Sequence, residues 1–236
     1  VVVANLDDLA VVDAVRDAPG RVVGFALATT RPGTVTWVHG RLLDADGAPI
    51  DMDLDGDSLA PHERANIAAA AAAAGLVGAS HEGIALALAN FTRLHHRTEL
   101  VGKADGVLYV DDSKATNPHA AVAAIRGYRQ VVLLAGGESK GVDLGALRVV
   151  ADRVRAVVAI GDTPEEVESA FAGAVPVTRA ASMRDAVRTA AELATEGDVV
   201  LLSPACASFD WYDGYAARGE AFDREVQDLI AERNPS

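Results

Sequence analysis

Three polar clusters in the sequence combine residue types that bind anions. Residues 111–116 read DDSKAT, residues 136–141 read GGESKG and residues 203–208 read SPACAS. Two of them contain a lysine, Lys114 and Lys140, and each contains at least one serine. Ammonium and hydroxyl groups that converge on one point hold a carboxylate or a phosphate through charge-assisted hydrogen bonds. These residue types therefore indicate a site for an anionic ligand.

Each cluster directly follows an apolar run, GVLYV, VVLLA or DVVLL. From residue 95 onward, strand-like runs alternate with helical segments at 117–127, 143–153, 164–171, 182–195 and 209–232. This alternation predicts right-handed crossover units and an open, mainly parallel α/β sheet covered on both faces. Ligands of such sheets lie at the carboxyl ends of the strands, beside positive helix ends. A single cluster would most often be a helix cap, but three together favour one shared site.

The first part of the chain has a different pattern. It predicts a strand at 1–4, a helix at 7–17, short strands within 21–56, and helices at 61–74 and 80–90. The alanine-rich run at 68–75 is typical of a close-packed helix. We therefore expect two domains, 1–94 and 95–236. Because a buried strand opens the sequence, we also expect it to begin in the middle of a domain.

Composition excludes several classes of function. The formal net charge of −13 comes from acids spread along the chain, which argues against nucleic-acid binding. Cys206 is the single cysteine, so no intrachain disulfide and no cysteine-rich zinc site are expected, and the cytoplasm is the expected compartment. The sequence also has no apolar run long enough to cross a bilayer.

Other candidate sites are weaker. DMDLDG at 51–56 resembles the start of an EF-hand loop, but His62 occupies the position of the bidentate glutamate, so a solvated strand face is the better interpretation. His95 and His96 are adjacent and would point to opposite faces of a strand, so we assign them no metal. We expect Cys206 to be a small core residue. Neither G-x-G-x-x-G nor the phosphate loop G-x-x-x-x-G-K-[ST] is present.

The order of the motifs resembles the Mur ligases of peptidoglycan synthesis, most of all the members that add D-glutamate. The motifs are HR at 96–97, DDSKAT, GGESKG, LSPACASFD at 202–210 and RGEAF at 218–222. PHERAN at 61–66 is similar to the H-N-x-x-N element of the family's central domain. The resemblance implies that 1–94 is the latter part of a central ATPase domain and that 95–236 is a complete dinucleotide-fold domain.

The resemblance also implies a reaction. ATP phosphorylates the carboxylate of UDP-N-acetylmuramoyl-L-alanine, and the amine of D-glutamate attacks the acyl phosphate. ATP and Mg²⁺ would be the cofactors, the two substrates would be the partners, and a monomer is expected. Since the phosphate loop and the family's main magnesium ligands match no part of this sequence, we name no metal residue and expect this chain alone to be inactive.

Residue roles follow from the same resemblance. Lys114 is expected nearest the transferring phosphoryl group, as the catalytic residue. The residues expected to bind D-glutamate are Thr116, Lys140, Ser208, Phe209 and Tyr215. The residues expected to bind ATP are Asn66, Arg97 and Asp112. Two departures weaken the match, because Glu63 replaces the first Asn of H-N-x-x-N and Tyr215 stands where Phe is usual.

Two alternatives stay open at this point. Other Mur ligases and the folylpolyglutamate synthases share the fold and the chemistry. A non-catalytic module that binds an anion or an amino acid would also account for the three clusters.

Overall fold

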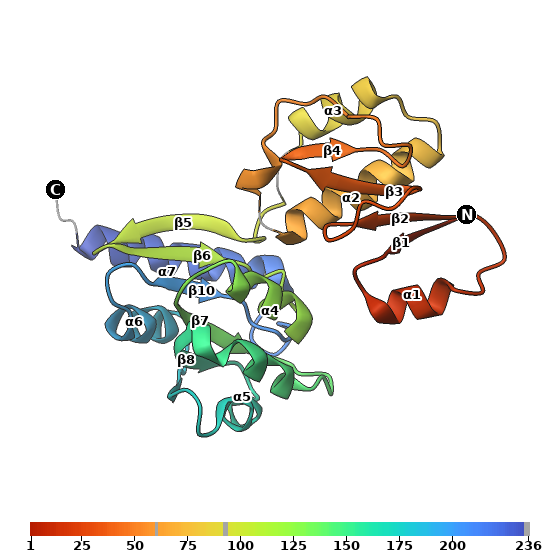
Figure 1. Ribbon diagram of the computed structural model, residues 1–236. Helices are drawn as coiled ribbons and strands as arrows, with labels where there is room; N and C mark the ends of the chain where they lie inside the picture. Colours follow the sequence, from red (N-terminus) through yellow and green to blue (C-terminus); the bar gives the residue numbers. More distant parts are fainter. Residues whose placement is uncertain (60, 92–93, 234–236) are drawn as a thin grey trace. The chain divides into compact units, whose positions relative to one another are not determined.

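The chain forms two compact units, Val1–Thr92 and Arg93–Ser236, which we call unit 1 and unit 2. The structure is a computed structural model that describes residues 1–59, 61–91 and 94–233 (Figure 1). The division falls two residues before the expected boundary between 94 and 95. Each unit has its own sheet.

Unit 1 is a four-stranded sheet with helices. Its strands lie in the order β1 (Val2–Asn5), β2 (Val22–Ala26), β3 (Thr34–Val38) and β4 (Arg41–Leu43). The first three are parallel, and β4 pairs with β3 in antiparallel fashion. The helical segments are α1 (Leu9–Val15), η1 (Gly56–Ser58), α2 (Pro61–Leu76) and α3 (His81–Ala89).

Helix α2 packs against the sheet of unit 1 through small side chains. Ala68, Ala71 and Ala72 are buried on it, at the i, i+3 and i+4 spacing of one helical face. This confirms that the alanine-rich run is a close-packed helix. The strand expected within 49–56 is absent, because Pro49 makes one isolated bridge and the chain then continues as loop to η1. The acids of that loop lie at the surface, and Asp51 pairs with Arg41.

Unit 2 is built on a six-stranded sheet. The strand order is β5 (Glu99–Ala104), β6 (Val107–Asp111), β10 (Val199–Leu202), β7 (Val131–Gly136), β8 (Val154–Ile160) and β9 (Val177–Arg179). Only β5 is antiparallel to its neighbour; the other pairings are parallel. The sequence pattern did not predict β5, an edge strand that contains Gly102 and a largely exposed Leu100.

Helices cover both faces of this sheet (Figure 1). They are α4 (Pro118–Arg126), η2 (Leu144–Arg153), α5 (Pro164–Phe171), α6 (Met183–Leu193) and α7 (Tyr215–Arg233). Strand β7 alternates between two cores: Val131 and Leu133 face the one that includes residues of α4, η2 and α5, whereas Val132 and Leu134 face the one that includes α6 and α7. This confirms the predicted α/β class with a mainly parallel sheet.

Two helices of unit 2 differ from their predictions. The segment 143–153 is a 3₁₀ helix that begins at Leu144. Helix α7 begins at Tyr215, six residues later than the sequence predicts, because 209–214 forms a turn in which the Asp210 carboxylate accepts the backbone N–H of Asp162. None of the helices in the described part of the chain is long and apolar enough to span a membrane.

Candidate anion-binding site at the carboxyl edge of the second sheet

The three polar clusters follow three strands that lie side by side. Strand β10 is flanked by β6 and β7, and Leu202 at its end is in register with Asp111 on one side and Leu134 on the other. Because all three strands are parallel, their loops leave the sheet at the same edge. We call them the β6 loop (112–117), the β7 loop (137–141) and the β10 loop (203–208).

Hydrogen bonds fasten the β6 loop to the β10 loop. The Ser203 hydroxyl donates to Oδ2 of Asp112 at 2.8 Å, and the backbone N–H of Asp112 donates to the carbonyl of Leu202 at 2.8 Å. The N–H of Ala205 donates to the carbonyl of Ala115 at 2.9 Å. These three hydrogen bonds connect the two loops directly.

The β7 loop is tied to the β10 loop in the same way. Glu138 and Ala207 exchange two backbone hydrogen bonds of 3.0 Å each, a short antiparallel bridge beyond the ends of the parallel strands. Gly137 has φ of 132° and lies close to the carbonyl of Ala207, so a side chain there would collide with the bridge. This explains the second glycine of the Gly-Gly pair at the start of the cluster.

Arg218 on α7 is the centre of the assembly. It is 2% exposed, and its guanidinium donates to the hydroxyl and carbonyl of Ser113 in the β6 loop and to the carbonyls of Cys206 and Ala207 in the β10 loop. Burial lowers the pKa of Arg218 to about 10, so the side chain still carries its charge at neutral pH. One buried cation thus organises the main chain of two loops.

The turn before β5 presents Arg97. His96 and Thr98 on either side of it have φ of 61° and 51°, a left-handed conformation that non-glycine residues seldom adopt. Three hydrogen bonds connect this turn to the β6 loop. The N–H of Lys114 donates to the His96 carbonyl at 3.0 Å, and the N–H and hydroxyl of Thr98 donate to Oδ1 of Asp112 at 3.2 Å and 3.5 Å. As a result the exposed Arg97 side chain is anchored to the β6 loop.

Asp112 is the polar group where the turn and two loops meet. It is 5% exposed, and burial raises its pKa to about 6 despite the hydrogen bonds from Ser203 and Thr98. Each carboxylate oxygen has two lone pairs, so capacity for one more hydroxyl donor remains.

Both lysines of the clusters lie over aromatic rings. Nζ of Lys114 is 3.9 Å from the centre of the Tyr215 ring, and Nζ of Lys140 is 4.6 Å from that of Phe209. Lys140 also pairs with Glu138 at 3.4 Å and has φ of 50°. Each ammonium group therefore lies over the face of an aromatic ring, and that of Lys140 also has a carboxylate partner.

Most hydroxyls of the clusters serve the loops themselves. Ser113 and Ser203 are fully buried, and their hydroxyls donate to the Tyr215 carbonyl and to Asp112 respectively, so these two hydroxyls connect elements of the fold. Ser208 is also buried, at 2% exposure, whereas Thr116 is half-buried. Asp111 is 0% exposed and bonds to His96 and to the Ser113 N–H, so it too is internal.

The remaining predicted residues have different surroundings. Asn66 is exposed on α2 in unit 1. Cys206 is buried, and burial raises its pKa to about 11, which confirms the expectation of a core thiol. The two histidines were expected on a strand, but they lie in the turn before β5, with His95 exposed and His96 buried.

Two residues that organise this edge were not assigned roles from the sequence. Arg218 lies at i, i+3 and i+4 with Ala221 and Phe222, a spacing that would have indicated a buried arginine on the apolar face of the helix. Asp223, one turn after Gly219, carries no comparable signal.

The geometry defines a dinucleotide-type α/β domain in which three polar loops gather at the carboxyl ends of the strands. The family model described as Mur ligase, glutamate ligase domain, matches residues 96–206, which span all three loops up to Cys206. A pseudomurein peptide ligase type C from Methanothermus fervidus has a similar fold, with a TM-score of 0.70 and 13% identity over 96% of this chain and 56% of that one.

Two relatives carry the same name, UDP-N-acetylmuramoylalanine--D-glutamate ligase. The protein from Frankia casuarinae is 45% identical over 95% of this chain and 50% of its own length, and the one from Desulfosudis oleivorans is 51% identical over 72% of this chain and 38% of its own length. The chain therefore spans half or less of the length of these relatives. It belongs to the Mur ligase family.

Proposed function

We propose that this chain is the acceptor-binding part of an ADP-forming ligase that adds D-glutamate to UDP-N-acetylmuramoyl-L-alanine through an acyl phosphate. The observation that carries the proposal is the convergence of the three loops, which bring two of the three lysines in the sequence to one sheet edge. The two relatives named for this reaction support the choice of acceptor.

The roles we propose follow from charge and placement. D-glutamate carries two carboxylates, and Lys140, Thr116 and Ser208 would hold them, with Phe209 and Tyr215 beside them. Since Ser208 is buried, its hydroxyl would become available only through a small movement of the β10 loop. Holding the amino acid in this way aims its amine at the acyl carbon, which is catalysis by positioning.

Lys114 is the residue that we propose for the transferring phosphoryl group. It is half-buried and follows the rigid Asp112–Ser113 pair, so its flexible stem can follow oxygens that move as the bond to phosphorus breaks. A cation at that point stabilises the charge that develops on the phosphoryl oxygens and on the tetrahedral intermediate.

Arg97, Asp112 and Asn66 are the residues that we propose for ATP. The guanidinium of Arg97 would pair with a phosphate, the carboxylate of Asp112 would accept from the ribose, and Asn66 would contact the adenine. Mg²⁺ would neutralise the phosphates when bound. We place the reaction in the cytoplasm and propose that the enzyme is a monomer. Cleavage of ATP would need a phosphate loop, a motif that this sequence does not contain.

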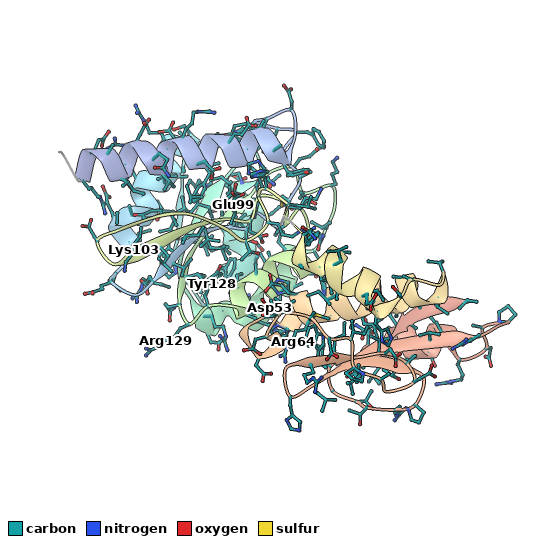
Figure 2. The ribbon with its side chains drawn as sticks, turned by 90° about the horizontal axis from the view of Figure 1, so that it is seen from above. Asp53, Arg64, Glu99, Lys103, Tyr128 and Arg129 are labelled. Atoms are coloured by element: carbon teal, nitrogen blue, oxygen red, sulfur yellow. The ribbon has the colours of Figure 1, made fainter. Side chains whose placement is uncertain are left out.

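The test is phosphate release by the protein with its upstream region restored, given ATP, Mg²⁺, UDP-N-acetylmuramoyl-L-alanine and D-glutamate. Lys114→Ala should lower the rate by at least about 100-fold, the usual scale for loss of one charge-stabilising group. Lys103→Ala is the matched control, because Lys103 projects from β5 and is exposed (Figure 2). Equal rates for the two variants would refute the assignment of Lys114.

A further inference from the structure

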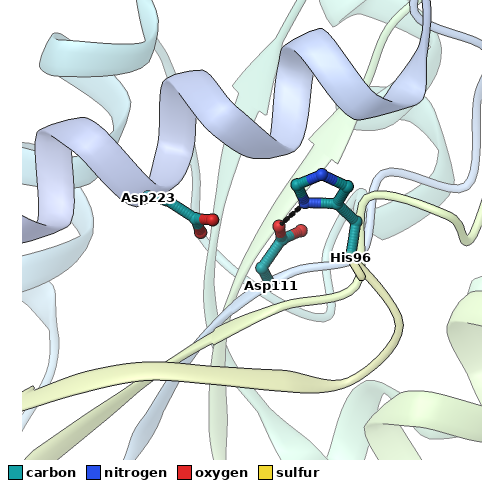
Figure 3. A group of neighbouring side chains, drawn as sticks. All are labelled: His96, Asp111 and Asp223. Atoms are coloured by element: carbon teal, nitrogen blue, oxygen red, sulfur yellow. Dashed lines mark hydrogen bonds and ion pairs between the residues drawn. The ribbon is translucent and has the colours of Figure 1, made fainter. Parts of the chain in front are cut away.

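Three titratable side chains meet beside the site without entering it. Ligand atoms of His96, Asp111 and Asp223 all lie within 4.8 Å of one another, and Nδ1 of His96 is 2.5 Å from Oδ2 of Asp111 (Figure 3). Asp111 is fully buried and His96 is 8% exposed. His96 immediately precedes Arg97, and Asp111 immediately precedes the β6 loop, so this cluster lies at the base of both.

Helix α7 is shaped to receive the pair. Gly219 and Asp223 are four residues apart and therefore lie on the same face of the helix. A Cβ added at Gly219 would lie closer to Nδ1 of His96 than van der Waals contact allows, so the missing side chain lets the pair approach the helix backbone. One turn later, the Asp223 carboxyl group reaches toward Asp111 from the helix (Figure 3).

The charges around the cluster favour a proton shared by the two carboxyl groups. Oδ1 of Asp223 is buried and has no hydrogen-bond partner among the described residues, and the Asp111 carboxylate lies within 4.8 Å of the Asp223 carboxyl group. A proton on Asp223 would turn that oxygen into a donor with Asp111 as its nearest acceptor. Glu99 from β5 and Asp112 from the β6 loop add negative charge nearby, Arg218 on α7 is a facing cation, and the imidazole of His96 bonds to Asp111. Two adjacent carboxylates in a buried site do not both ionise readily.

We propose that Asp223 is a positioning residue that shares a proton with Asp111, so that the chain of bonds Asp223–Asp111–His96 ties helix α7 to the turn of Arg97 and to the β6 loop. The effect of these bonds on the reaction rests on the proposed roles of Arg97 and Lys114. The bonds themselves can be tested without that assumption, because all three residues belong to unit 2.

The electrostatics of Asp223 agree with this arrangement. Burial, and then the charge of Asp111, raise its pKa to about 6. An acid whose pKa is raised by folding keeps its proton in the folded state where the unfolded chain has lost it. The proposed bond to Asp111 is therefore largely formed at pH 5 and is lost as the pH rises through about 6.

The experiment is a carboxyl ¹³C NMR titration of this chain from pH 4 to pH 8, with amide spectra at each point. We expect the Asp223 carboxyl carbon to titrate near pH 6. Asp112 has its own pKa near 6, so the carboxyl signals must be followed one by one. At pH 5, Asp223→Asn keeps a donor toward Asp111 and should leave the amide signals of Arg97, Ser113 and Lys114 in place.

Asp223→Ala removes that donor and should shift these three amides at pH 5. Asp228→Asn is the matched control, because Asp228 is an exposed acid on the same helix. An Asp223 signal that titrates near 4, or equal amide shifts in Asp223→Asn and Asp223→Ala, would overturn the proposal. So would stoichiometric Zn²⁺ or Mg²⁺ that moves the three side-chain signals, since a cation would then replace the proton. None of these readouts requires ligase activity, so failure here is distinct from failure of the proposed function.

Discussion

Lys140 is the residue for which the account makes its sharpest functional prediction. Its ammonium group is exposed in a strained loop, over Phe209 and beside Glu138, where it can exchange these partners for a ligand carboxylate. Loss of a charged hydrogen bond is worth about 1.5–3 kcal/mol, so Lys140→Ala should raise KM for D-glutamate by roughly 10- to 100-fold. KM for ATP should change little, because Lys140 is proposed to contact only the amino acid.

Steady-state kinetics of the restored full-length protein would measure both constants. Lys103→Ala serves again as the control for loss of one surface lysine. An unchanged KM for D-glutamate in Lys140→Ala would refute the proposal that Lys140 in the β7 loop binds D-glutamate.

Asp112 gives a prediction for stability against pH. Burial raises its pKa from 3.8 to about 6. Between these values the folded chain retains a proton on Asp112 that the unfolded chain releases, so the contribution of Asp112 to the free energy of unfolding falls as the pH rises from about 4 to about 6 and is level above that. A difference of roughly two pKa units corresponds to about 3 kcal/mol.

Asp112→Asn cannot titrate, so its stability should fall less over the same pH interval. Urea unfolding of the chain and of this variant at pH 4.5, 5.5, 6.5 and 7.5 would measure the difference. Parallel curves for the two proteins would contradict the assignment of this titration to Asp112.

At the scale of elements, two helical glycines should respond in opposite ways to the same substitution. A Cβ at Gly219 in α7 would collide with His96 and Asp111, whereas a Cβ at Gly75 in α2 would meet nothing within 4 Å. Gly219→Ala should destabilise unit 2 by roughly 1–3 kcal/mol through overpacking. Gly75→Ala should stabilise unit 1 by roughly 0.5–1 kcal/mol, the ordinary gain for alanine in a helix.

Amide hydrogen exchange resolves the two units and would measure each effect where it occurs. If Gly219→Ala stabilised unit 2, the close packing of α7 against His96 and Asp111 would be contradicted.

The elements differ in how well the sequence predicts them, for physical reasons. The parallel strands of unit 2 are buried on both faces and therefore read as continuous apolar runs. β5 is an edge strand with one wet face and a glycine, so its pattern is weak. The sequence did predict that the three loops share one edge of the sheet, because the carboxyl ends of parallel strands lie on the same side. Arg218 and Asp223, by contrast, act through contacts with residues about 100 positions away, and local patterns do not contain such information.

At the scale of the whole molecule, unit 2 has the features of a domain that folds independently. It has a complete sheet and two cores, one on each face, and the three site loops are tied together within it. A protein consisting of residues 94–236 should therefore unfold in a single cooperative transition. Coincident curves from circular dichroism and tryptophan fluorescence of Trp211 would confirm this, and a non-cooperative melt would show that unit 2 depends on unit 1.

The measurement that tests the central claim most directly is the mass of the product formed by the restored full-length protein. It would receive ATP, Mg²⁺ and UDP-N-acetylmuramoyl-L-alanine with either D-glutamate or L-glutamate. The account predicts a product heavier by one glutamyl residue with the D form only, together with one ADP and one phosphate per product. Equal product from both forms, or product only with a different amino acid, would contradict it.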